Sequence, residues 1–183
     1  MKPVAIIIGV VGSVLLCIGA WIPIKATLAQ LLIEQAWQAS QSEGRIVKPW
    51  PWIDTWPVAR LSVPGHDVSV VAMNGLSGQA LAFGPGLLVP GVAAGNPSTR
   101  VIAGHNDTHF RFLEDLKPGD AIHLETQTGT LRYLVSDSTV LDVRNGPVAV
   151  SGQDQLLLIT CYPFDMSATN GPLRYAVTAV REV

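Results

Sequence analysis

The 183-residue sequence is poor in cysteine and in clustered positive charge. Its two cysteines are Cys17, inside an apolar N-terminal run, and Cys161, so a framework of disulfide bonds is excluded. The formal net charge is −2, and no dense group of Lys or Arg marks a nucleic-acid-binding surface. No GxGxxG or P-loop motif follows a predicted strand, so a nucleotide site has no support. Nucleic acid is therefore not expected as a partner.

A long apolar run occupies residues 3–24 and contains no charged residue. A helix rises about 1.5 Å per residue, so about 20 residues cross the ~30 Å hydrocarbon layer of a membrane. We expect residues 1–25 to form a cytoplasmic tip and a transmembrane anchor, since Lys2 favours a cytoplasmic N-terminus. A cleaved signal peptide is the alternative, because small side chains stand in residues 18–20, near the end of the run. In both cases the remainder of the chain is exported.

Residues 26–57 are predicted to form a stalk helix and a linker rich in Trp and Pro. Apolar side chains recur at spacings of three and four over residues 26–39, which is typical of a helix. Residues 48–57, KPWPWIDTWP, contain three Pro and three Trp, which excludes a helix and favours an extended segment. Three rings are expected to hold the linker against the domain that follows: Trp50, Trp52 and Trp56. Trp21 and Trp37 are candidates for a membrane interface.

From residue 58 onward, short apolar segments alternate with Gly, Pro, Asn and Asp. Strands are predicted over residues 58–63, 68–72, 79–83, 100–103, 121–126, 130–143, 156–160 and 174–181. One helical turn is expected over residues 110–116, with Asn106, Asp107 and Thr108 as candidate caps. So many short strands favour a closed or nearly closed β-barrel. Residues 58–183 are therefore predicted to form one all-β domain.

The stretch LLLITC ends in Cys161, the only cysteine outside the apolar N-terminal run. A lone thiol in an exported domain is either a buried small hydrophobe or a nucleophile presented at the end of a strand. His105 follows Gly104 at the end of a predicted strand, where a side chain reaches the rim of a barrel. An imidazole activates a cysteine through proximity in space, so His105 is the candidate partner. His66 in a turn and His123 in a strand are interpreted as surface residues.

A metal site is the competing interpretation of the same residues. His105 and His109 stand four positions apart, with Cys161 as a candidate third ligand. The sequence HNDTH lacks the Glu of the HExxH zinc motif, and no second set of Cys or carboxylate ligands stands at metal spacing. We therefore expect no metal and no cofactor.

Together these motifs resemble the sortases, the membrane-anchored cysteine transpeptidases of bacterial envelopes. The resemblance covers residues 59–183 and rests on VIAGHND, FRFLEDLKPGD, LLLITC and GPLRYAVTAV. It implies that His105, Cys161 and Arg174 are the catalytic residues. The fold that it implies is a sortase-like closed eight-stranded β-barrel with short helices, preceded by an N-terminal transmembrane helix.

The implied reaction is cleavage of a C-terminal sorting signal of a surface protein through a thioacyl-enzyme intermediate, followed by transfer to an amine acceptor. The implied location is the extracytoplasmic side of the bacterial inner membrane. Leu157 replaces the first Thr of the family's TLxTC motif, at what we interpret as a packing position. No acidic cluster precedes Cys161, so calcium dependence is not expected.

The stretch CYPFDMSATNGPLR looks most like the sortases of Gram-negative marine bacteria, whose substrate is thought to be a surface protein with a von Willebrand-type domain. Two other functions stay open. One is a hydrolytic cysteine peptidase on the same barrel, which would need no acceptor amine. The other is a non-catalytic, membrane-tethered domain that binds an envelope protein, with Cys161 buried.

Overall fold

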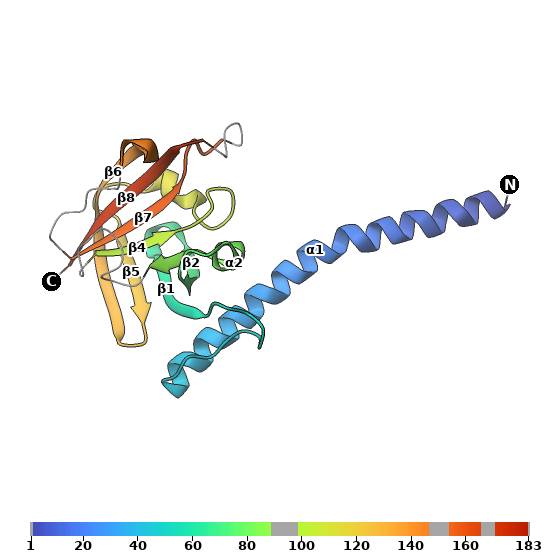
Figure 1. Cartoon of the computed structure of the whole chain (residues 1–183), viewed down its shortest axis with the longest axis horizontal. Helices are drawn as coiled ribbons and strands as arrows, with labels where there is room; N and C mark the ends of the chain where they lie inside the picture. The colour runs from blue at the N-terminus through green and yellow to red at the C-terminus, as the bar shows by residue number, and fades with distance from the viewer. Residues whose placement is uncertain (1, 89–98, 147–153, 166–170, 183) are drawn as a thin grey trace.

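The computed structural model describes residues 2–88, 99–146, 154–165 and 171–182 as a closed barrel with one long helix beside it (Figure 1). The strands close in the order β1-β2-β3-β4-β7-β8-β6-β5. Their bounds are β1 Pro57–Val63, β2 Val68–Asn74, β3 Gly86–Leu88, β4 Thr99–Ala103, β5 Ala121–Thr126, β6 Gly129–Asp142, β7 Gln155–Cys161 and β8 Leu173–Arg181. The short helices are α2 (Gly78–Phe83) and the 3₁₀ turns Pro64–His66, Arg111–Asp115 and Val143–Asn145. The predicted all-β barrel with eight strands is confirmed.

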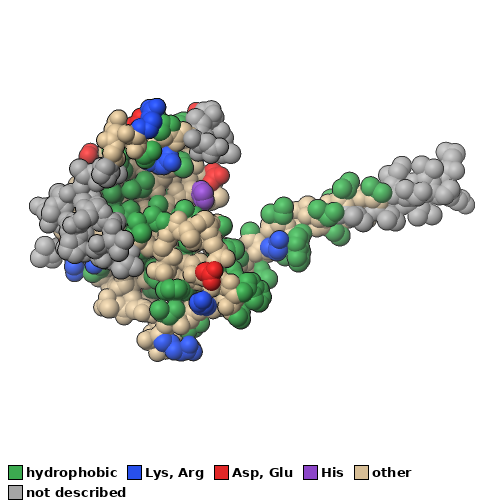
Figure 2. All heavy atoms as spheres, viewed as in Figure 1, with side chains coloured by type: hydrophobic (Ala, Val, Ile, Leu, Met, Phe, Trp, Pro, Cys, Tyr) green, Lys and Arg blue, Asp and Glu red, His purple; other side chains and the backbone are tan. Residues whose placement is uncertain are grey.

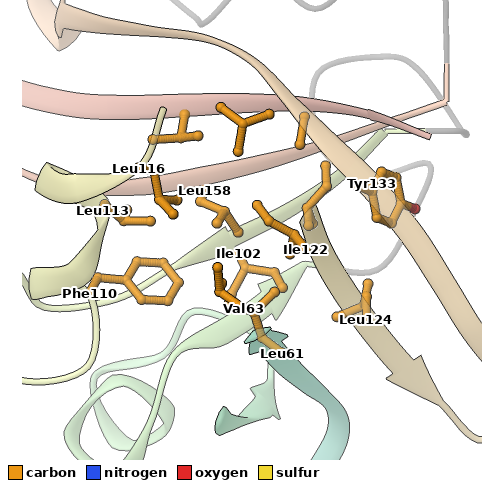
Figure 3. Close-up of a cluster of buried hydrophobic side chains, with 14 of the residues drawn as sticks. Leu61, Val63, Ile102, Phe110, Leu113, Leu116, Ile122, Leu124, Tyr133 and Leu158 are labelled. Atoms are coloured by element: carbon orange, nitrogen blue, oxygen red, sulfur yellow. The ribbon is translucent and has the colours of Figure 1, made fainter. Parts of the chain in front are cut away.

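The interior of the barrel is filled by side chains that alternate along its strands. In β1 every second residue is buried, from Pro57 to Val63. Figure 3 shows the centre of this core, where residues from β1, β4, β5, β6 and β7 meet Phe110, Leu113 and Leu116 from the segment after β4. Burial of each large apolar side chain contributes about 1.5–3 kcal/mol. The barrel interior is therefore a packed core, and any site must lie at its rim or on its outer face.

One predicted strand is wrong, because residues 79–83 belong to the helix α2. The hydroxyl of Ser77 accepts a hydrogen bond from the backbone N–H of Ala80 at 3.1 Å, which caps the start of this helix. The strand that the sequence did not reveal is β3, which is only three residues long. A Cβ on its first residue, Gly86, would stand 2.2 Å from the carbonyl oxygen of Gly75, so only glycine fits this close approach.

The predicted stalk is part of one continuous helix, α1 (Lys2–Glu43), which also contains the apolar run. The portion Val11–Glu43 is long and apolar enough, by length and composition, to cross a membrane. In Figure 1 the N-terminal half of α1 projects away from the barrel, and its C-terminal half lies beside β1 and β2. The stalk is therefore a direct extension of the apolar segment, with no loop between them.

Apolar packing fixes the second half of α1 to the barrel. Ile33 packs with Ile53 of the linker, with Met73 of β2 and with Ala80 of α2, and all four are fully or almost fully buried. Trp37 does not lie at a membrane interface, as the sequence suggested, but is only 2% exposed. These contacts make α1 and the barrel one packed unit.

Hydrogen bonds join α1 to the barrel at three levels along the helix. About two thirds of the way along the helix, Gln30 Nε2 donates to the carbonyl oxygen of Phe83 in α2 at 2.7 Å. One turn further, Arg60 of β1 donates to the carboxylate of Glu34 at 2.5 Å. Near the end of the helix, Gln41 Nε2 donates to the carbonyl oxygen of Thr126 in β5 at 3.3 Å. The barrel thus lies lengthwise along α1.

The linker between α1 and β1 only partly follows its prediction. It contains no helix, as its prolines require, but it turns and bends at residues 49–52 in place of running extended. The ring of Trp50 packs edge-on against Phe83 of α2, with a centroid distance of 5.0 Å, so its predicted clamping role is confirmed. Trp52 is 79% exposed and clamps nothing, so that prediction is wrong.

We expect a chain that begins at Ala26 to be soluble and folded, because it keeps the half of α1 that packs on the barrel. A chain that begins at Val58 lacks Ile33, Trp37 and Ile53, each of which contributes about 1.5–3 kcal/mol through burial. Its melting temperature, followed by circular dichroism, should therefore be clearly lower. Equal melting temperatures for the two chains would contradict the packing of α1 on the barrel.

Candidate active site

β4 and β7 run parallel and side by side, although 56 positions separate their hydrogen-bonded ends. Their register pairs Thr99 with Gln155 and Ala103 with Ile159. The pairing continues beyond β4, because the N–H of Gly104 donates to the carbonyl oxygen of Ile159 at 3.1 Å. His105 and Cys161 each stand two positions beyond the last ladder pair, so the structure brings them to neighbouring strand ends.

Gly104 and Thr160 lock these two strand ends together. The hydroxyl of Thr160 donates to the carbonyl oxygen of Gly104 at 2.7 Å, just before both candidate residues. A Cβ on Gly104 would stand 3.0 Å from the ring of Phe110, which is tighter than most real contacts, so the ring packs where a side chain would be. The N–H of Phe110 donates to the carbonyl oxygen of His105 at 2.9 Å and closes the loop. The backbone of His105 is therefore held from both sides.

Cys161 lies on the outer face of the barrel and not in its core. Along β7, Leu156 and Leu158 enter the main core, whereas Leu157 and Ile159 belong to a second cluster on the opposite face. Because successive side chains of a strand alternate between faces, Cys161 continues the outer row. It is half-buried, and His105 is exposed. The interpretation of Cys161 as an inert core residue is therefore not supported.

Arg174 stands directly opposite Cys161 in the antiparallel pairing of β7 with β8. Side chains of directly opposed residues lie on the same face, with their Cβ atoms about 4.5–5.5 Å apart. One nitrogen of the guanidinium, Nη1, donates to the carbonyl oxygens of Gly171 and Leu173, both at 2.7 Å. Within the described parts of the chain, the other N–H groups of Arg174 have no hydrogen-bond partner. The side chain is thus anchored through one nitrogen and keeps donors for a ligand.

A groove of about 500 Å³ lies on the outer face beside these residues. Its floor includes Val101 and Ala103 of β4 and Ile159 of β7, and Arg174 stands at one side. Another wall comes from the end of β6 and the 3₁₀ turn Val143–Asn145. Most of the lining is apolar, so the groove suits an apolar or extended peptide segment and ends in a cation.

Two side chains that the sequence did not single out for the site connect the loops after His105 and Cys161. Asn106, which is almost fully buried, donates through Nδ2 to the carbonyl oxygen of Pro163 at 2.9 Å. Arg111 Nη1 donates to the carbonyl oxygen of Phe164, also at 2.9 Å. The prediction of Asn106 as a helix cap is wrong, because the turn Arg111–Asp115 begins after Phe110 without a side-chain cap. Asn106 instead sets the relative position of the two loops.

The remaining histidines are not part of this arrangement. His66 lies in the turn after β1, where its Nε2 is 2.9 Å from the carboxylate of Asp120. His123 is half-buried in β5 between two fully buried neighbours. Burial lowers the pKa of His109, and the nearby His105 lowers it further. Across the described ranges, no three His, Cys, Asp or Glu side chains are grouped as a metal site would need.

Comparison with known proteins identifies relatives of this barrel. Residues 61–182 match the family model described as the sortase domain. Sortase D of Bacillus subtilis (strain 168) is 26% identical over 123 residues, which are 66% of this chain and 62% of that protein. The match to the family model begins at Leu61, inside β1, so α1 and the linker lie outside it.

Solved structures give the same result. Sortase A from Corynebacterium diphtheriae is 29% identical with a TM-score of 0.58, over 72% of this chain and 63% of that chain. Sortase C-1 from Actinomyces oris is 31% identical with a TM-score of 0.56, over 69% of this chain and 75% of that chain. The chain thus spans less than two thirds of the length of Bacillus subtilis Sortase D and of Sortase A from Corynebacterium diphtheriae.

We expect Asn106→Ala to lower the free energy of unfolding by about 1–3 kcal/mol, because it leaves the carbonyl oxygen of Pro163 without its donor. Asp107→Ala is the matched control, since Asp107 is exposed and adjacent. Urea unfolding of both variants, followed by fluorescence, measures the difference. If the two variants are equally stable, the bond to Pro163 does not connect the loops in solution.

Proposed function

Because the chain belongs to the sortase family, we propose that it is a membrane-anchored cysteine transpeptidase. It would cleave a C-terminal sorting signal of a surface protein and transfer the upstream part to an amine acceptor. The observation that carries this proposal is the alignment of three strand ends. The parallel pairing of β4 with β7 brings together the strand ends that precede His105 and Cys161, and Arg174 is paired with Cys161 in the register of β7 with β8.

Cys161 is the proposed nucleophile. Its Sγ attacks the carbonyl carbon of a peptide bond in the groove, the C–N bond breaks, and the upstream segment stays on the sulfur as a thioester. The acceptor amine then attacks the thioester, forms a new amide and releases the thiol. Cys161 is half-buried, and the groove is lined by Ile159, two positions before it, and by Arg174, which is paired with it, so a peptide in the groove would lie near the sulfur.

His105 is the proposed proton carrier. It donates a proton to the leaving amine in the first step and accepts one from the incoming amine in the second. Its protonated imidazole also favours the thiolate form of a neighbouring cysteine. The exposed position of His105 at the rim supports this role, because an acceptor amine can approach it from solvent.

Arg174 is the proposed electrostatic partner of the reaction. Arginine side chains do not give up their proton in proteins, so an arginine is not a candidate base. Donors on the same face as Cys161 are suited to hold the substrate backbone and to stabilise the oxyanion that forms during attack. The two backbone carbonyls that bind Nη1 would keep the remaining N–H groups aimed at the groove.

Residues 1–25 are proposed to anchor the protein in the bacterial inner membrane, with the barrel on the extracytoplasmic side. The length and apolar character of α1 support a single span. Hydrophobic side chains cover the described part of α1 where it leaves the barrel, as Figure 2 shows. The likeness of CYPFDMSATNGPLR to the sortases of Gram-negative marine bacteria suggests a surface protein with a von Willebrand-type domain as substrate.

We expect Cys161→Ala to abolish turnover, because the change removes the nucleophile and little volume. The assay is processing of quenched fluorescent peptides that carry candidate sorting motifs, with a primary amine as acceptor. Cys17→Ala is the control and should keep full activity, since Cys17 lies on the projecting part of α1. Turnover by the Cys161 variant would refute the mechanism, and release of product without amine incorporation would identify a hydrolytic peptidase.

We expect Arg174→Lys to reduce the rate of processing about 10²–10³-fold, the usual effect of losing one oxyanion donor. Lysine keeps the charge but loses the planar set of donors. Arg132→Lys is the matched control, because Arg132 is an exposed cation in β6. Melting temperatures of both variants should stay near that of the parent chain. A nearly unchanged rate for Arg174→Lys would remove this residue from the site and favour the binding-domain alternative.

A further inference from the structure

The loop that carries His105 lies close to the part of α1 that directly follows the apolar segment. A cavity of about 290 Å³ separates α1 from β2, and it is lined by Thr27, Gln30 and Leu31 of α1 together with His109. His109 ends the loop that begins at His105. In Figure 1 this loop, after β4, lies on the side of the barrel that faces the projecting half of α1. The rim with the candidate site is therefore level with residues 27–31.

The opposite end of the barrel is level with the C-terminal end of α1. The hairpin between β5 and β6 is joined to the helix by the hydrogen bond from Gln41 to Thr126. Thr126 pairs with Gly129 at this hairpin, whereas Asp142, at the other end of β6, pairs with Leu173 beside the site. The barrel therefore has one end near the apolar segment and one end far from it.

The number of residues between Lys25 and a given position of α1 gives the height of that position above the end of the apolar segment. Thr27 and Leu31 stand two and six residues beyond Lys25, which is about 3 and 9 Å along a helix. Gln41 stands 16 residues beyond Lys25, or about 24 Å. The headgroup layer on each side of the ~30 Å hydrocarbon core is only about 5–7 Å thick. The site is thus at the height of the headgroups, and the β5–β6 hairpin is well above them.

The exposed apolar surface of α1 independently supports this height of the site. Leu28 is 53% exposed and Leu31 is 56% exposed, although both follow Lys25. The large side chains just before Lys25, such as Trp21, are exposed to a similar extent. An apolar helix surface that continues for two turns past the charged residue is suited to the boundary between headgroups and acyl chains. It places lipid at the same level as the loop after His105.

We propose that α1 holds the barrel on the membrane surface with the Cys161 rim facing the lipid headgroups. This inference rests on the anchoring part of the proposed function. The enzyme would then act only on peptide segments close to the bilayer, because a bond in the groove would be about three extended residues, at ~3.3 Å each, from the hydrocarbon core.

Depth-dependent quenching tests this orientation in the full-length chain. A Cys17→Ser, Cys161→Ala background leaves one introduced thiol for a fluorescent maleimide, at Thr108→Cys beside the site or at Gln127→Cys in the β5–β6 hairpin. Both positions are exposed. The labelled chains are placed in vesicles of phosphatidylethanolamine and phosphatidylglycerol that contain lipids with a nitroxide on the headgroup. The label at Thr108 should lose several-fold more fluorescence than the label at Gln127.

Equal quenching at the two positions, or stronger quenching at Gln127, would overturn the proposed orientation. A chain that does not float with the vesicles would overturn the membrane anchor together with the orientation. The measurement needs no substrate, so its outcome is separate from that of the transpeptidase assay. If the parent chain shows no peptide-processing activity while the labelled chains show the expected quenching, the orientation is supported and only the enzymatic function is refuted.

A helical insertion tests the role of α1 directly. Seven residues inserted after Ala26 lengthen the helix by about 10 Å and add nearly two full turns, so the barrel keeps its rotation about the helix axis relative to the apolar segment. The contacts of α1 with the barrel all follow the insertion and are unchanged. The insertion should abolish most of the quenching at Thr108 and leave the label at Gln127 unquenched. If the label at Thr108 stays quenched, the rim reaches the lipid by a route other than α1, and the proposal is wrong.

Discussion

The parallel hydrogen bonding of β4 with β7 is the constraint on which the rest of the site depends. It joins two segments that are 56 positions apart, and its last bonds involve Gly104 and Thr160, immediately before the imidazole and the thiol. Buried leucines on the inner face of β7 keep that strand in register, since a slip of one residue would exchange the core and groove faces. Packing in the core of the barrel therefore fixes which residues of β7 face the groove on its outer surface.

Most of the barrel could be predicted from the sequence, because half-buried strands alternate with a period of two and are bounded by turn residues. The segment at residues 79–83 was misassigned, since a six-residue helix capped by Ser77 has too few turns to show a helical period. β3 was missed because three residues carry no alternation. The continuation of the helix beyond the apolar run was indicated by the sequence, because apolar spacings of three and four persist over residues 26–39 although the composition changes at Lys25.

His105 and Cys161 could be singled out as candidates because each stands at the end of a predicted strand, whereas Arg174 was identified only through the resemblance to the sortases. The residues that hold the loops after His105 and Cys161 in place could not be located from the sequence. Asn106 bonds to a backbone carbonyl 57 positions away, and Arg111 to one 53 positions away. A backbone acceptor is available at every residue, so such a contact leaves no sequence pattern. The orientation of the barrel on α1 was equally hidden, because it depends on scattered polar pairs such as Glu34 with Arg60.

The order of the strands along the chain also determines when the site can form during folding. Parallel strands that are distant in sequence pair late in folding, since a long loop must close before their contacts form. Among the described residues, β7 and β8 are the last strands in sequence order, and β8 completes the pairing on the far side of Cys161. If residues 1–25 anchor the chain as proposed, a chain exported N-terminus first would have its helix in the bilayer while Cys161 and His105 are still far apart. The proposed active site would then form only after the anchor is in place.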